Sequence, residues 1–235
     1  MTENNSLNKI IIRTAFPKFG TLEKLIHQNL KLKPFMNDYA SLLAPNETYH
    51  LYNRANGEET IFLSQENYRF FLEKYKLYIH PIADTYCYCL LPNHFHFLIR
   101  IKSEKELKKA FHNFDTDKEF GPILSKQFSN FFSSYTQAFN KQQKRKGSLF
   151  MKNFKRKKIT DMRYLLKVVH YIHYNPVEAG LAKKPIDWEN SSYKSLISDK
   201  PTQLLREELI DLFSDKENFE YVHLHPPKQT GIEPW

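Results

Sequence analysis

The sequence predicts an α+β fold of the ferredoxin-like, split βαβ type: an antiparallel sheet with helices on one face. Three observations lead to this fold class. Runs in which apolar residues alternate are interspersed with runs in which they have helical spacing. A Pro-Asn pair joins two adjacent strand-like runs as a tight turn. The resulting order (strand, helix, strand, strand, helix, strand, helix) is that of a split βαβ unit.

The regular pattern lies between residues 47 and 197, which we take as the main domain. Residues 1–46 are predicted to form an N-terminal helical extension, and residues 198–235 a C-terminal extension with one helix and a Pro-rich tail. Strands are predicted at 47–55, 84–91, 94–101 and 151–159, and helices at 21–32, 34–43, 65–79, 103–114, 122–141, 161–175 and 203–213. Asp161 is expected to cap the helix at 161–175, and Pro176 to end it.

Composition excludes several classes of protein. Of the 235 residues 41% are hydrophobic, a globular value, and no apolar run approaches the roughly 18 residues that span a bilayer. The first residues lack the basic and apolar regions of a secretory signal. The two cysteines, Cys87 and Cys89, have the spacing of neighbours on one face of a strand, so no disulfide is expected. These features favour a cytoplasmic protein without a membrane partner.

The net charge of +9 is concentrated in one segment. Residues 141–158 contain nine basic residues and no acidic one. Removing these nine from the 35 Lys and Arg leaves 26, equal to the 26 Asp and Glu of the whole chain. The segment also contains apolar and aromatic residues, unlike a disordered basic tail. It therefore favours a surface that binds a polyanion, with nucleic acid as the first candidate.

Two histidines stand out in the predicted strand at 94–101. Residues i and i+2 of a strand project to the same face, so His94 and His96 point together and can converge on one metal ion. The spacing alone also fits a coincidence among ten histidines, and His223 and His225 repeat it in the C-terminal extension. A metal site and two unrelated histidines both remain open at this point.

The helix at 161–175 offers further chemistry. Tyr171 and Asn175 are four residues apart and share one face of the helix. An amide oxygen beside two imidazoles suits Mg²⁺ or Mn²⁺, and a tyrosine one turn away can attack a phosphate that such an ion polarises. The alternatives are that Tyr171 is one of 14 tyrosines packed in the core and that Asn175 only precedes a helix-ending proline.

Four segments together resemble a known family. They read CLLPNHFHFLI at 89–99, GSLFMKNFKRKKI at 147–159, YLLKVVHYIHYNPVEAGL at 164–181 and WENSSYKSL at 188–196. In this order they resemble the HUH-type single-tyrosine transposases, and most of all the REP-associated tyrosine transposases. The resemblance covers residues 48–196.

The resemblance implies a metal-dependent endonuclease and strand transferase that acts on single-stranded, hairpin-containing DNA. It implies His94, His96 and Asn175 as ligands of Mg²⁺ or Mn²⁺, and Tyr171 as the nucleophile that forms a 5′-phosphotyrosine link and leaves a free 3′-OH. The spacing of His173, two residues after Tyr171, directs it to another side of the helix, so we interpret it as structural or DNA-facing.

The resemblance also assigns a role to the basic segment. It implies a DNA path, read mainly through phosphates, along Lys144, Arg145, Lys146, Lys152, Lys155, Arg156 and Lys158. Phe150 and Phe154 lie among these residues and either stack on bases or belong to the core. Arg54 in the first strand either contacts a phosphate near the metal or is a solvated edge residue.

Two other functions compete with DNA cleavage. The first is a non-cutting, domesticated regulator that binds DNA hairpins on the same fold, against which the intact Tyr171 and histidine pair argue. The second is an RNA-binding module, which would need exposed aromatic residues at the centre of its sheet. The sequence does not distinguish a monomer from a homodimer. In a bacterium, a cytoplasmic protein of this kind would associate with the nucleoid.

Overall fold

The computed structural model describes residues 41–111, 119–225 and 232. The predicted helix at 21–32, most of the one at 34–43, the end of the one at 103–114 and most of the Pro-rich tail lie outside the described residues. Within the described ranges, no helix combines the length and the apolar character needed to cross a membrane.

A four-stranded antiparallel sheet forms the centre of the molecule. Its strands are β1 (Thr48–Arg54), β2 (Ala83–Leu91), β3 (His94–Ile101) and β4 (Lys155–Lys158), in the order β2-β3-β1-β4. β3 lies between β1 and β2, which are connected through helix α3 (Gln65–Tyr78), so the split βαβ unit is present. The predicted α+β class with an antiparallel sheet is therefore confirmed, although β4 is shorter than the predicted strand at 151–159.

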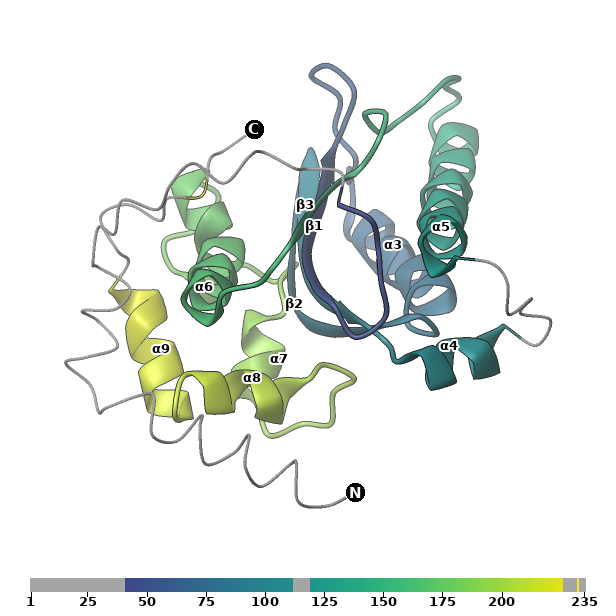
Figure 1. Ribbon diagram of the computed structural model, residues 1–235. Helices are drawn as coiled ribbons and strands as arrows, with labels where there is room; N and C mark the ends of the chain where they lie inside the picture. The colour runs from purple at the N-terminus through teal and green to yellow at the C-terminus, as the bar shows by residue number, and fades with distance from the viewer. Residues whose placement is uncertain (1–40, 112–118, 226–231, 233–235) are drawn as a thin grey trace.

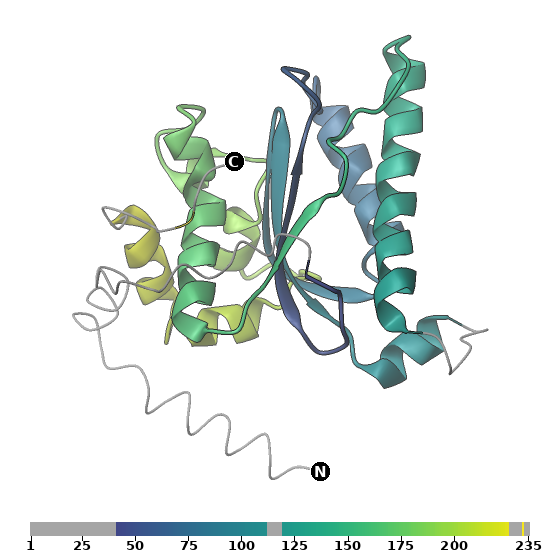
Figure 2. The ribbon, with the colours of Figure 1, turned by 45° about the horizontal axis from the view of Figure 1, so that its top comes forward.

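Helices cover both faces of the sheet, whereas the sequence predicted them on one face (Figures 1 and 2). Beside β1 on one side are α3 and α5 (Phe120–Gln142), with α4 (Glu104–Ala110) near the end of the sheet. The other side carries α6 (Met162–Glu178), the 3₁₀ turn η1 (Pro185–Asp187), α7 (Tyr193–Ile197), α8 (Arg206–Leu212) and α9 (Lys216–Leu224).

The two helical layers are explained by apolar residues on both faces of the strands. Phe95, Phe97 and Ile99 of β3 belong to the core beneath α3 and α5, where Phe97 stacks on Tyr75 with ring centroids 4.3 Å apart. Leu98 of β3 joins a second core with residues of β2 and α6. Both faces bury apolar side chains, so each needs a helical cover.

Helix α6 begins as predicted but ends later. The Asp161 carboxylate accepts from the Tyr164 N–H at 2.9 Å, which is the expected N-cap. Pro176 lies inside the helix rather than ending it. In the last turn its ring removes only one intrahelical hydrogen bond, and the helix stops where Gly180 adopts a φ of +69°. The Leu181 N–H donates to the Pro176 carbonyl at 2.8 Å, and the Gly180 N–H donates to the Val177 carbonyl at 3.0 Å. These two hydrogen bonds form a Schellman motif.

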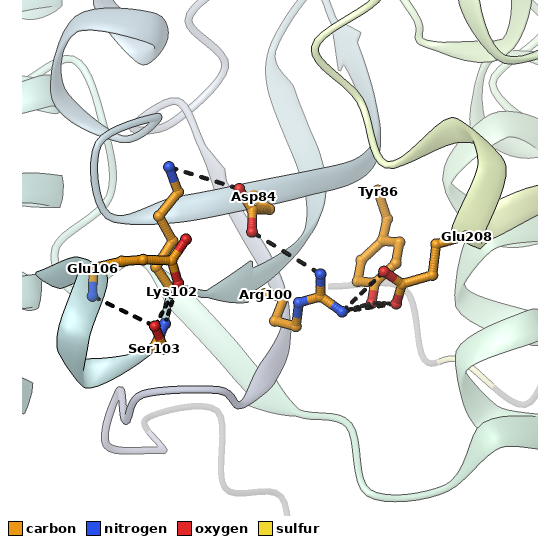
Figure 3. A network of polar contacts seen from close by, with 7 residues as sticks. All are labelled: Asp84, Tyr86, Arg100, Lys102, Ser103, Glu106 and Glu208. Atoms are coloured by element: carbon orange, nitrogen blue, oxygen red, sulfur yellow. Dashed lines mark hydrogen bonds and ion pairs between the residues drawn. The ribbon is translucent and has the colours of Figure 1, made fainter. Parts of the chain in front are cut away.

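The described part of the C-terminal extension packs onto the sheet through α8 and α9. Leu209, Leu212 and Phe219 share one core with α6. Glu208 of α8 accepts from Arg100 Nη1 of β3 at 2.7 Å and from the Tyr86 hydroxyl of β2 (Figure 3). The division at residue 197 stays a prediction about domain organisation, but in space the core continues across it.

The same figure shows how this ion pair joins the end of the sheet. Arg100 also approaches Asp84, which lies 3.7 Å from Lys102 Nζ. Next to Lys102, Ser103 caps α4 in a reciprocal capping box with Glu106 (Figure 3). The sheet is thus tied to α8 on one side and to α4 on the other.

A chain of buried polar groups links α6 to α9 and β2. His173 Nδ1 lies 3.0 Å from His223 Nε2, and His173 Nε2 lies 2.8 Å from Ser192 Oγ. His223 Nδ1 donates to the Phe219 carbonyl at 2.7 Å, so its Nε2 accepts the proton of His173 Nδ1. His173 and His223 are both fully buried, so His173 is structural and does not face DNA.

We expect this buried histidine chain to make the protein sensitive to acid. Burial lowers the pKa of His223 to about 4, below the value of about 6.5 in an unfolded chain. The neutral imidazole therefore favours folding fully above pH 6.5, and this advantage, on the order of 3 kcal/mol, is lost as the pH falls from 6.5 towards 4. The slope of unfolding free energy against pH, measured by urea denaturation near pH 5.5, gives the number of protons taken up on unfolding. His223→Asn should lower this number by about one.

The exposed His225 provides the matched control, because His225→Asn also removes one histidine but leaves the buried chain of His173 and His223 intact. An unchanged slope in His223→Asn would contradict the assignment of the acid sensitivity to the buried chain.

Candidate functional site

The alternation of β3 directs two histidines towards α6. His94 and His96 lie on the same strand face as Leu98, and Leu98 packs against α6. His96 is 1% exposed and His94 is half-buried. The ring centroids of the pair are 5.2 Å apart. The structure thus brings the two predicted ligands together.

Asn175 of α6 lies between the two imidazoles. Its Oδ1 is 3.2 Å from His94 Nε2, and its Nδ2 is 3.3 Å from His96 Nε2. The two histidines come from one strand and the amide from a helix about eighty residues later. The three predicted metal ligands therefore converge on one point, and each imidazole presents its Nε2 atom there.

Tyr171 lies one helical turn before Asn175 and packs against the same pair. Its ring meets that of His96 edge-on, with centroids 5.2 Å apart. The side chain is 5% exposed, and this burial raises the pKa of Tyr171 to about 12, although a hydrogen bond with Asn175 opposes the shift. The predicted nucleophile is thus protonated at neutral pH and adjoins the predicted ligands.

A further histidine, His50 of β1, belongs to this cluster and was not singled out in the sequence. Its Nε2 lies 3.0 Å from Nδ1 of His96, and its ring centroid lies 6.1 Å from that of Tyr171. The alternation of the first strand does place His50, Tyr52 and Arg54 on one face. Only the pairing of β1 with β3 shows that His94 and His96 lie on the same face of the sheet as these residues.

Arg54 sits directly beside the histidine pair. In the β1–β3 register it is opposite His94, and opposite residues of an antiparallel pair share a face. Burial lowers the pKa of His94 to about 4; the hydrogen bond with Asn175 opposes this shift, and the Arg54 charge adds to it. Arg54 therefore adds positive charge to the face of the sheet that carries His50, His94 and His96, which we call the site face.

The donors at this point suit a divalent cation. The described residues hold no group of three His, Cys, Asp or Glu side chains that could bind a metal. The Asn175 amide, in contact with both imidazoles, is the candidate for a third donor. His94 Nδ1 lies 2.7 Å from Asn93 Oδ1, and His94 Nε2 lies 3.2 Å from Asn175 Oδ1. A neutral imidazole carries a single proton, so the tautomer with this proton on Nδ1 leaves a lone pair on Nε2 beside the amide oxygen. In that tautomer the ring nitrogen and the amide oxygen can both coordinate a divalent cation.

The basic strand β4 divides its charges between the two faces of the sheet. Lys155 is opposite Tyr52 and Lys157 is opposite His50, so both lie on the site face. Lys157 Nζ lies 4.5 Å from the centroid of the Tyr164 ring of α6, in agreement with this placement. Arg156 and Lys158 are opposite residues of the other core and face away from α6.

Several of the predicted DNA-binding residues already have protein partners. Arg145 bonds both carboxylate oxygens of Glu59 at 2.7 Å, Arg156 donates to the Ser41 carbonyl at 2.6 Å, and Lys158 Nζ lies 2.8 Å from Glu47. The exposed predicted residues on the loops before β4 are Lys144, Lys146 and Lys152.

The aromatic residues of the basic segment belong to the core. Phe150 is 5% exposed, and Phe154 packs on Phe128 with ring centroids 5.1 Å apart. The proposed role in base stacking therefore has no support from their positions. The predicted basic residues are thus divided between the two faces of the sheet and the loops before β4, and their contact with DNA stays a prediction.

A cavity of about 710 Å³ opens away from this site, between α3 and the segment around Thr202. It is lined by Tyr68, Tyr88 and Phe97, among others, and none of the predicted ligands or Tyr171 contributes to it. The candidate site between β3 and α6 is therefore separate from this cavity.

Comparisons with known proteins agree with the resemblance drawn from the motifs. No protein-family profile matches the chain. A Haemophilus influenzae protein that carries the name REP-associated tyrosine transposase is 28% identical over an alignment of 119 residues, and the alignment covers 48% of this chain. The match spans 61% of the length of that relative, less than two thirds.

A solved structure supports the same fold. It is a REP-associated tyrosine transposase bound to a REP hairpin, and it superposes with a TM-score of 0.52 over 71% of this chain and 89% of that one. The sequence identity is 18%, so the superposition establishes the fold alone. The sequence match thus confirms the predicted resemblance to the REP-associated tyrosine transposases, and the superposition confirms the fold.

Proposed function

We propose that this protein is a transposase-like, metal-dependent endonuclease and strand transferase that acts on single-stranded, hairpin-containing DNA. One observation carries the proposal: Tyr171 and Asn175 of α6 meet His94 and His96 of β3 at a single point. The similarity to proteins named as REP-associated tyrosine transposases, one of them bound to a REP hairpin, supports the choice of substrate.

The proposed reaction exchanges one phosphodiester for another. The hydroxyl oxygen of Tyr171 attacks the phosphorus, a bond forms between them, and the bond from phosphorus to the 3′ oxygen breaks. The tyrosine loses its proton, and the departing 3′ oxygen gains one. A 5′-phosphotyrosine link and a free 3′-OH result, and attack by a 3′-OH on this link rejoins the strands without an external energy source.

His94, His96 and Asn175 would hold the divalent cation, Mg²⁺ or Mn²⁺. When bound, the cation would neutralise phosphate charge and polarise the bonds to phosphorus. The two imidazoles are suited to this role because burial lowers the pKa of each, so both are neutral at physiological pH. Metal ligation by histidine requires the neutral ring.

Tyr171 must be both exposed and deprotonated before it can attack. Its pKa of about 12 leaves very little phenolate at neutral pH, and only 5% of the side chain is exposed. We infer that DNA entry displaces part of the cover over the ring, and that positive charge at the site favours the phenolate. Arg54, opposite His94 in the strand register, is one candidate among the basic residues of the site face.

The architecture argues against the RNA-binding alternative. Such a module reads bases with aromatic residues exposed on its sheet, whereas here helices cover both faces. No specific observation favours the non-cutting regulator. A cytoplasmic location, with nucleoid association in a bacterium, follows from the proposed DNA substrate.

The covalent intermediate gives the most direct test of the enzyme. With Mn²⁺ and a labelled single-stranded DNA that contains a hairpin, the protein should form an adduct that resists denaturation. Tyr171→Phe should abolish the adduct, because the attacking oxygen is missing, while hairpin binding in a gel-shift assay persists. Tyr174→Phe, on the same helix, is the control and should retain the adduct.

His96→Ala should bind DNA but reduce adduct formation at least 100-fold. If Tyr171→Phe formed the adduct as well as the original protein, the assignment of the nucleophile would be wrong. Hairpin binding without an adduct in any divalent metal would favour the regulator.

The division of charge on β4 gives a second prediction. Lys155→Ala and Lys157→Ala should each weaken DNA binding and lower the dependence of log K on log salt by about one unit, because each cation faces the site. Lys158→Ala is the matched control on the same strand; its side chain faces away and pairs with Glu47, so affinity should change less than twofold. Equal losses in all three variants would mean that DNA does not follow the site face.

A further inference from the structure

We propose that His50 is a positioning residue that fixes the tautomer and orientation of His96, so that His96 Nε2 is presented to the cation. This inference rests on the metal site of the proposed function. His50 makes no contact of its own with the ligand point in this arrangement: its role is exerted through His96.

The contact between the two rings is direct and buried. His50 Nε2 lies 3.0 Å from His96 Nδ1, and the side chains belong to residues that are 2% and 1% exposed. The rings are nearly parallel, with centroids 5.2 Å apart and an interplanar angle of 26°. A buried hydrogen bond of this kind has no water to replace it, so losing it leaves a polar group unsatisfied.

The proton positions follow from the partners. His96 Nε2 faces the Asn175 Nδ2 group at 3.3 Å, which can only donate, so this nitrogen of His96 accepts. In a neutral ring the proton is then on Nδ1, and His96 donates it to Nε2 of His50. The tautomer with Nδ1–H and a lone pair on Nε2 is the one that a metal ligated through Nε2 requires.

The geometry also separates the role of His50 from that of a ligand. The two nitrogens of an imidazole point to different sides of the ring, so His50 and Asn175 lie on different sides of His96. The Nε2 lone pair of His50 is used in the bond with His96. The arrangement is that of a metal-binding histidine supported by a hydrogen-bond acceptor on its other nitrogen.

β1 places this acceptor through its pairing with β3. His50 is opposite Leu98, and its neighbour Tyr52 is opposite His96. The Tyr52 ring packs against both imidazoles, with centroids 4.8 Å from His50 and 5.6 Å from His96. The register of two strands, together with an aromatic neighbour, therefore holds the two rings in contact.

Two substitutions at His50 separate hydrogen bonding from packing. His50→Gln places an amide oxygen close to the former position of Nε2 and can accept the His96 proton, whereas His50→Leu fills space without an acceptor. We expect His50→Leu to weaken Mn²⁺ binding 10- to 100-fold by calorimetry, and His50→Gln to remain within about threefold of the original protein. Tyr75→Phe, which removes a buried hydrogen bond to Thr85 on the opposite face, controls for stability and should not change Mn²⁺ affinity.

A second readout needs no metal. The ¹⁵N chemical shifts of the His96 ring in the metal-free protein should show a proton on Nδ1 in the original protein and in His50→Gln, and a mixture of tautomers in His50→Leu. An Nε2–H tautomer in the original protein, or unchanged tautomer and affinity in His50→Leu, would overturn the inference. If the original protein bound no Mn²⁺, the proposed metal site would fail, and the ring shifts would still decide the role of His50.

Discussion

The contact between Asn175 and the two imidazoles of β3 is the interaction on which the site depends. Polar groups buried on an otherwise apolar sheet face are costly unless they bond one another, and here His50, His96, His94 and Asn175 form a continuous polar cluster. The apolar side chains of α6 on the same core, such as Val168 and Ile172, fix the height and rotation of the helix over the sheet. The polar cluster then defines which turn of the helix lies above the histidines. Because Tyr171 is one turn before Asn175, this arrangement also places Tyr171 next to the histidines.

Elements that lie later in the chain stabilise the position of α6 over the sheet. The buried chain from Ser192 through His173 to His223 ties α6 to α9, and the Arg100–Glu208 ion pair ties α8 to the strand that carries both histidines. The ion pair is partly exposed and contributes little by itself, whereas the histidine chain is fully buried and is costly to disrupt. Residues predicted to form a C-terminal extension thus contact both α6 and β3, the two elements that carry the candidate site.

Local patterns in the sequence predicted the features that depend on local geometry. The alternation in β3 places His94 and His96 on one face, and the spacing of Tyr171 and Asn175 places them on one side of α6. The features that were missed depend on pairing between distant segments. Lys155 and Arg156 look equivalent in a basic run until the register with β1 assigns them to opposite faces. In the sequence His50 is one histidine in an alternating strand, and only the pairing of β1 with β3 places it beside His96. The second helical layer depends in the same way on the packing of Leu98 against α6.

We propose that two imidazoles and one amide form a single metal site next to Tyr171. Electron spin-echo envelope modulation of bound Mn²⁺ measures it directly, because nitrogen nuclei that coordinate the ion modulate the echo. We expect one bound Mn²⁺ with two coordinated imidazole nitrogens in the original protein and with one such nitrogen in His94→Gln. A bound ion without nitrogen modulation, or with the same modulation after the His94 substitution, would contradict it.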